Sequence, residues 1–97
     1  MPYFLVELRY EQREQIDLLR PRHRDHIERL FNKGQVASAG RFSDNSGSVF
    51  LYRVDVEAEL LPLVESDPYL QEGVAAIISM RAFEPGIAAA IQYARPA

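Results

Sequence analysis

Strand-like and helix-like segments alternate along the chain, and their order limits the fold more than any other feature of the sequence. Four segments have the apolar, β-forming character of strands: 2–10, 35–42, 48–54 and 74–83. A turn rich in Ser, Asp, Asn and Gly separates the second segment from the third, which predicts a hairpin. Helical patterns fill the other two intervals. The order β-α-β-β-α-β predicts an α+β, ferredoxin-like fold, with a four-stranded antiparallel sheet and both helices on one face.

The first long helix is predicted to begin near Pro21, because proline suits the first turn of a helix and disrupts its interior. Arg20 would then lie at the helix entrance and His23 in the first turn. An apolar stripe continues on the face of His23, at Ile27, Leu30 and Phe31. Gly34 is expected to end this helix.

The second helical interval, 55–66, contains Pro62, so its regular part is predicted to begin at about 59–61. Asp67-Pro68-Tyr69 is expected to start a further helical turn, with Asp67 as its N-cap. Residues 1–86 are therefore expected to form one domain. Residues 87–97 would form a C-terminal tail of weak helical character, whose apolar part could recruit a partner helix.

Composition excludes several classes of function. The chain has 97 residues and no cysteine, which leaves room for one small domain and rules out disulfides, thiol catalysis and Cys-ligated zinc. The net charge of −3 does not provide a basic footprint for nucleic acid. No apolar run approaches the roughly 18 residues of a membrane span, and residues 1–9 do not resemble a signal peptide. The expectation is a cytoplasmic protein that binds neither nucleic acid nor membrane.

The first and last strand patterns carry apolar residues on both faces. The two helices would cover only one face of the sheet. A bare apolar face favours association, and a domain of this size gains buried area by it. The sequence therefore predicts a homodimer in which two sheets pack face to face.

His23 is the strongest candidate for chemistry. It is either a core histidine whose ring is satisfied, or a general acid and base that needs a nearby carboxylate. His26 follows at i+3, but without an HExxH-type pattern neither a metal site nor a cofactor is predicted. Asp67 is fully explained as a helix cap, unless it shares that role with a contact to His23. Arg20 is suited to hold a carboxylate or phenolate of a ligand.

Three runs resemble the YCII-related (YciI-like) family: Arg20-Pro21-Arg22-His23, then 34–40 ending in Ala39-Gly40, then Asp67-Pro68-Tyr69 followed by Gly73-Val74. The resemblance covers roughly residues 2–85. It implies a ferredoxin-like domain that dimerises as an α/β barrel. It also implies a cleft holding a His–Asp pair, which matches His23 and Asp67, with Arg20, Gly40 and Tyr69 at other motif positions around it.

The chain departs from the family pattern at three places. Arg41 stands where the family commonly has proline after Ala-Gly, which changes the rim of the cleft. Pro62 interrupts a helix that is usually free of proline. The hairpin at 43–48 is short, which would leave the cleft more open.

The resulting expectation is a small homodimeric enzyme of the lyase or isomerase type. His23 would move a proton, Asp67 would orient and stabilise the charged ring, and Arg20 would hold an anionic group of a small substrate, aromatic or anionic. The alternative is a non-catalytic module that binds a small metabolite or serves as an accessory dimerisation unit. The substrate itself is not inherited with the fold.

Overall fold

Four strands form one sheet in the computed structural model of the chain, which describes residues 2–86. They are β1 (Tyr3–Tyr10), β2 (Val36–Arg41), β3 (Gly47–Arg53) and β4 (Ala75–Phe83). The sheet order is β2-β3-β1-β4, and every neighbouring pair is antiparallel. The sheet is open and does not close on itself. The predicted ferredoxin-like α+β fold is confirmed.

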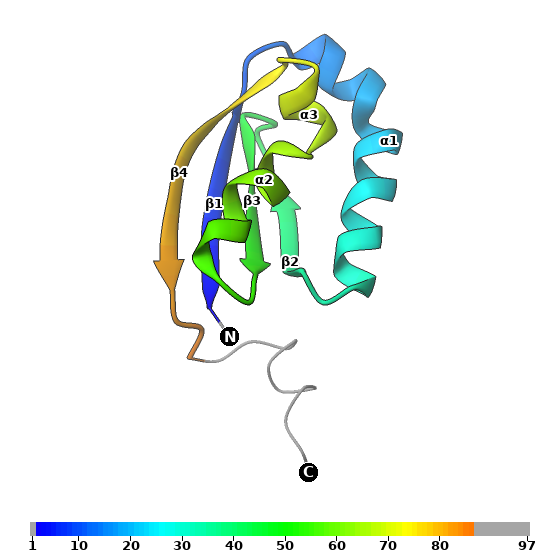
Figure 1. Cartoon of the computed structure of the whole chain (residues 1–97). Helices are drawn as coiled ribbons and strands as arrows, with labels where there is room; N and C mark the ends of the chain where they lie inside the picture. Colours follow the sequence, from blue (N-terminus) through cyan, green and yellow to red (C-terminus); the bar gives the residue numbers. More distant parts are fainter. Residues whose placement is uncertain (1, 87–97) are drawn as a thin grey trace.

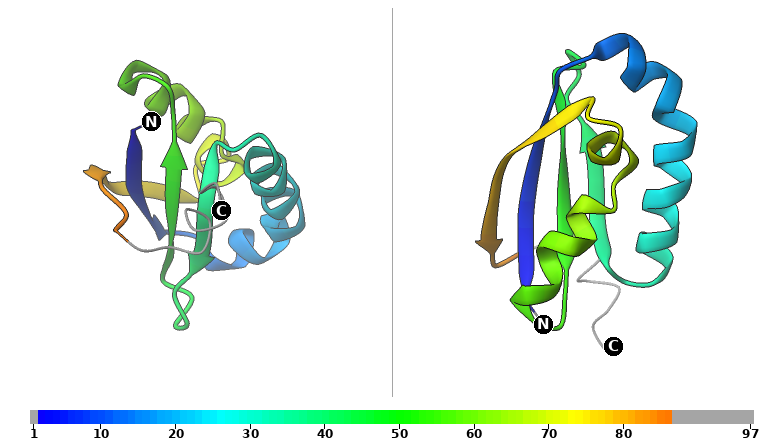
Figure 2. Two further views of the ribbon diagram at one scale, coloured as in Figure 1. Left: turned by 90° about the horizontal axis from the view of Figure 1, so that it is seen from below. Right: turned by 45° about the horizontal axis from the view of Figure 1, so that its top comes forward.

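The helices lie together on one face of this sheet (Figure 1, Figure 2). They are α1 (Arg13–Asn32), α2 (Leu60–Glu65), which follows the short 3-10 helix η1 (Glu57–Glu59), and α3 (Pro68–Gln71). The late start of α2 agrees with the effect expected of Pro62. Among the described residues, no helix is both long and apolar enough to cross a membrane. The predicted tail at 87–97 lies outside the described residues.

The start of α1 was predicted wrongly. The helix begins at Arg13, and Pro21 lies inside it. Arg20 and His23 are consequently in the middle of α1 rather than at its entrance and first turn. The position of His23 on the helix face that meets the sheet layer is unaffected by this difference.

Burial of the first turn explains why α1 begins early. Ile16 is fully buried, and its amide donates to the carbonyl of Gln12 at 3.0 Å. Burying an isoleucine side chain stabilises by about 1.5–3 kcal/mol, which is comparable with the roughly 3 kcal/mol that an interior proline costs. Pro21 is exposed, so the carbonyl of Asp17, which loses its helical partner, can bond to water.

The end of α1 follows the prediction. Gly34 adopts a positive φ of 78°, and the amide of Gln35 donates to the carbonyl of Leu30 at 2.9 Å, which closes the helix with a Schellman pattern. Phe31 differs from the expectation, because 56% of it is exposed and it does not join the buried stripe.

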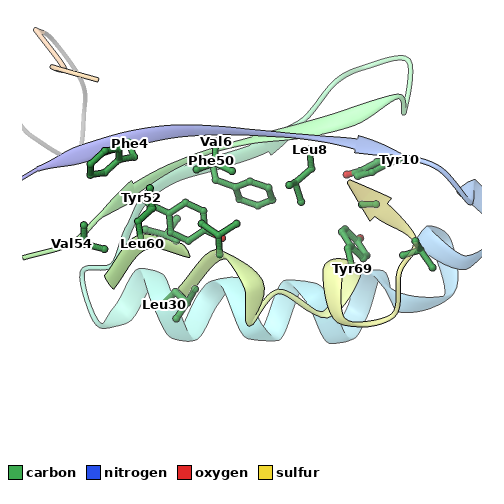
Figure 3. Close-up of a cluster of buried hydrophobic side chains, with 14 of the residues drawn as sticks. Phe4, Val6, Leu8, Tyr10, Leu30, Phe50, Tyr52, Val54, Leu60 and Tyr69 are labelled. Atoms are coloured by element: carbon green, nitrogen blue, oxygen red, sulfur yellow. The ribbon is translucent and has the colours of Figure 1, made fainter. Parts of the chain in front are cut away.

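The core lies between the sheet and the helices (Figure 3). Alternate residues of β1 point into it, as the period of two predicts: Phe4, Val6, Leu8 and Tyr10. On β3, Phe50 and Tyr52 point into the same layer and meet Leu30 of α1 and Leu60 of α2 in this cluster. The remaining residues of each strand face the side of the sheet without helices.

β1 and β3 approach each other closely at Gly47. This residue pairs with Arg9, and a Cβ placed on it would overlap the backbone carbonyl of Leu8. Gly40 on β2 is different, since a Cβ there would meet nothing within 4 Å. The two glycines therefore make a matched pair for testing the β1–β3 contact.

We expect Gly47→Ala to lower the free energy of unfolding by about 1–3 kcal/mol, because the methyl group must push two central strands apart. Urea unfolding followed by circular dichroism measures this change. Gly40→Ala is the control and is expected to stay within about 0.5 kcal/mol of the natural chain. Equal stability of the two variants would contradict the close approach at Gly47.

Candidate active site

The structure brings His23 and Asp67 together, although 44 positions separate them in the sequence. Nε2 of His23 lies 2.9 Å from Oδ2 of Asp67. The Asp67 side chain has no exposed surface, and that of His23 is 12% exposed. A carboxylate only accepts hydrogen bonds, so Nε2 carries the proton and Nδ1 of the neutral ring keeps a lone pair. Nδ1 has no hydrogen-bond partner among residues 2–86.

Asp67 has both roles that the sequence left open. Its Oδ1 accepts a hydrogen bond from the backbone amide of Tyr69 at 2.8 Å and so caps α3, while Oδ2 binds His23. The backbone of Asp67 is extended and Pro68 takes the first helical position, which directs the carboxylate back over the helix start. One buried carboxylate therefore joins the N-terminus of α3 to the middle of α1.

Two aromatic rings fix the orientation of the His23 imidazole. The Tyr69 ring stacks on it with centroids 3.8 Å apart and planes 4° apart. The Phe50 ring meets it edge to face at 5.7 Å. With Nε2 bound to Asp67 and one face against Tyr69, the imidazole is held in one position.

The second histidine, His26, contacts Ser66, which is the residue directly before Asp67. Nε2 of His26 lies 3.3 Å from Oγ of Ser66, and that hydroxyl donates to the carbonyl of Leu63 at 2.5 Å. Burial lowers the pKa of His26, against an opposing effect from the charge of Asp67. Consecutive residues, Ser66 and Asp67, thus hold the two histidines separately. In the part of the chain that the structure describes, no three side chains converge as metal ligands.

A cleft of about 360 Å³ lies between α1 and the β2 side of the sheet. His23 is part of its wall, and Asp67 lies behind His23. The predicted residues Arg20, Gly40 and Tyr69 also line the cleft. The full lining consists of Tyr10, Arg20, His23, Arg24, Ile27, Glu28, Ala39, Gly40, Arg41, Ser48, Phe50 and Tyr69.

Arg20 lines the cleft but already has partners. Its guanidinium donates to Oδ1 of Asn45 at 3.0 Å and lies 3.1 Å from Oδ1 of Asp17. Asn45 is at the tip of the β2–β3 hairpin, where its φ is 60°. Arg20 therefore ties α1 to the hairpin, which leaves less of its charge for a ligand than the sequence suggested.

The tyrosines near the pair stay protonated at neutral pH. Burial, and then the neighbouring Tyr10, raise the pKa of Tyr69 to about 12, although Arg20 opposes the shift. Burial and the negative charge of Asp67 also raise the pKa of Tyr52. Phenols in this state donate hydrogen bonds but do not act as bases, so imidazole is the group in this wall suited to accept a proton.

Sequence reasoning missed two buried hydroxyls. The Oγ of Ser48 and the phenol oxygen of Tyr52 are buried and have no hydrogen-bond partner among the described residues. A signal was available, because alternation along β3 puts Ser48 on the same core-facing side as Phe50 and Tyr52. A serine on an otherwise aromatic strand face is a candidate contact for a ligand.

Comparisons with known proteins agree with this fold. A family model described as the YCII-related domain matches residues 1–84. Among solved structures, the chain is similar to 5-chloro-2-hydroxyhydroquinone dehydrochlorinase from Burkholderia phenoliruptrix, in complex with 2,5-dihydroxybenzoquinone. The identity is 16% and the TM-score 0.56, and the match covers 88% of this chain and 93% of that one. No curated protein matches the chain significantly in sequence.

The lowered pKa of His26 predicts how its contribution to stability changes with pH. In the unfolded chain the His26 ring has its ordinary pKa of 6.5, and in the folded protein its pKa is lower. Protonation of the ring therefore disfavours the folded state. The contribution is therefore complete above pH 6.5 and is lost as the pH falls towards the folded pKa. We expect the stability difference between the natural chain and His26→Gln to shrink from pH 7.5 to pH 5.5, as measured by urea unfolding. A difference that stays constant with pH would contradict the burial of this ring.

Proposed function

The chain belongs to the YCII-related family, and we propose that it is a small enzyme of the lyase or isomerase type in which His23 transfers a proton and Asp67 orients it. The observation that carries the proposal is the 2.9 Å contact between Nε2 of His23, which lines a cleft, and the fully buried carboxylate of Asp67. A histidine held in this way by a carboxylate is suited to general acid and base catalysis.

The proposed step is a proton transfer at Nδ1. Its lone pair takes a proton from an acidic C–H or O–H of the substrate, and the electron pair stays on the substrate as an enolate or phenolate. The imidazolium is stabilised by Asp67, which remains ionised. The same proton then returns to another atom of the substrate, or to a leaving group, which gives isomerisation or elimination.

A small ring compound bearing oxygen fits the proposal best. Apolar and aromatic side chains form much of the cleft wall, including Ile27, Phe50 and Tyr69, and its volume is at the small end of the range for ligand sites. The structurally similar dehydrochlorinase was solved with 2,5-dihydroxybenzoquinone, which is such a compound. The same cleft without proton transfer would be a metabolite-binding module, and the assay below separates the two functions.

We expect the chain to accelerate the exchange of the ring hydrogens of 2,5-dihydroxybenzoquinone for deuterium, measured by proton NMR in D2O. Exchange at a ring carbon requires one proton to be delivered and one removed, which is the chemistry proposed for His23. His23→Gln should lower the rate by about 10²–10⁴-fold, the usual contribution of a general acid or base. Asp67→Asn should also lower it, because Asn cannot stabilise the imidazolium.

His26→Gln is the matched control for this assay. It removes the other histidine of α1, which binds Ser66 and does not line the cleft, so the exchange rate should stay unchanged. Binding of the quinone with equal affinity by the natural chain and His23→Gln, without catalysed exchange, would contradict the enzyme and favour the binding module.

A homodimer is the second part of the proposal. On the sheet face without helices, β1 and its neighbours place apolar pairs side by side: Leu5 with Leu51, and Tyr3 with Phe83. Val49 lies on this face as well, opposite Glu7. A second copy packed on this face would bury these side chains and form the α/β barrel that the family resemblance implies. The cytoplasmic location expected from the sequence stays a prediction.

We expect Val49→Lys to turn the dimer into a folded monomer, measured by analytical ultracentrifugation at micromolar concentration. The new ammonium group can pair with Glu7 in a monomer but would lose its water inside a sheet-to-sheet interface. Leu18→Lys is the control, since Leu18 is 74% exposed on α1, and this variant should remain a dimer. A natural chain that sediments as a monomer would refute the dimer.

A further inference from the structure

We propose that Arg41 and Ser48 form a subsite that binds the carboxylate of a small ring acid. The two residues are direct partners in the β2–β3 ladder, and both line the cleft. The proposal deepens the function given above, and it rests on that function for the position of the reacting group near His23. It adds the chemical class of the substrate and the residues that select it.

The first observation is the hydroxyl of Ser48. The residue is 3% exposed, and its Oγ has no hydrogen-bond partner among residues 2–86. Buried hydroxyl groups without a partner are rare, because they lose their bonds to water and gain nothing in return. Ser48 is also one of the residues that line the cleft, so a molecule bound there is placed next to this serine. An acceptor atom of a bound ligand satisfies its hydroxyl.

The second observation is the charge around the cleft. Three arginines line it against one glutamate, which gives a positive balance. Arg20 is bound to Asn45 and Asp17, and Arg24 lies 3.5 Å from Glu28. The guanidinium of Arg41, in contrast, has no ion-pair or side-chain hydrogen-bond partner in the described part of the chain. Arg41 is the arginine of this cleft whose charge is not already matched.

The two donors suit a carboxylate better than a single oxygen. A guanidinium presents several N–H groups in a plane, and the neighbouring hydroxyl supplies one O–H, so two oxygens of one group can each be bound. The rest of the ligand then lies against the apolar wall, which includes Ile27 and Phe50, towards His23. A ring acid thus has its charge bound by the sheet and its ring next to the imidazole.

Benzoate and benzamide test the subsite, because they have nearly the same shape and differ in charge. We expect benzoate to bind about tenfold more tightly than benzamide, in titrations followed by amide NMR shifts of the residues lining the cleft. Arg41→Gln should remove the preference. Ser48→Ala should weaken benzoate several-fold while leaving the urea midpoint equal or higher, since it deletes an unsatisfied hydroxyl.

Arg22→Gln is the charge-matched control. Arg22 lies outside the cleft, where it faces Glu72 at 3.6 Å, and the variant should bind benzoate as the natural chain does. Equal affinity for benzoate and benzamide, or equal losses in Arg22→Gln and Arg41→Gln, would overturn the subsite. Neither outcome would bear on proton transfer, because benzoate binding involves none and the quinone exchange assay tests His23 and Asp67 separately.

Discussion

The buried carboxylate of Asp67 is the interaction on which the arrangement of the helices depends. An ionised group without exposed surface is tolerated only when it is hydrogen-bonded or paired, and Asp67 meets this requirement with one oxygen on the amide of Tyr69 and the other on His23. The first bond starts α3 and the second fixes α3 against α1. Removing either partner would leave a buried charge incompletely satisfied, so the position of the imidazole and the packing of the helical layer are set together.

The two walls of the cleft come from different layers, and their polar groups differ in how completely they are bound within the protein. The helical wall carries the imidazole, whose position is fixed by Asp67 and by stacking on Tyr69. The sheet wall carries Arg41 and Ser48, whose polar groups are not matched within the described residues. A group that must keep its geometry during proton transfer benefits from a complete set of contacts. A group that must bind and release a ligand benefits from having no other partner within the protein.

Most of the fold could be predicted from the sequence, because its strands depend on local alternation and its turns on Ser, Asp, Asn and Gly. The start of α1 could not, since it depends on the burial of Ile16 in the tertiary structure, which offsets the local effect of Pro21. The His23–Asp67 contact was reached through the family resemblance, and spacing alone left it open. Alternation along β3 places Ser48 on the core-facing side, but only the packed structure determines whether its hydroxyl has a partner in reach.

The place of β2 at the sheet edge means that the rim of the cleft can change in sequence without loss of the fold. From β2 the core takes Val36 at the start of the strand, whereas Arg41 at its end is exposed and has a neighbouring strand on one side only. A substitution at position 41 therefore alters the charge at the cleft rim but removes no core contact and leaves Asp67 covered. A substitution at Tyr69 would alter both, because its ring packs on His23 and its amide binds Asp67. The charge at the end of β2 can therefore vary, while the contact between His23 and Asp67 stays constrained by the stability of the helical layer.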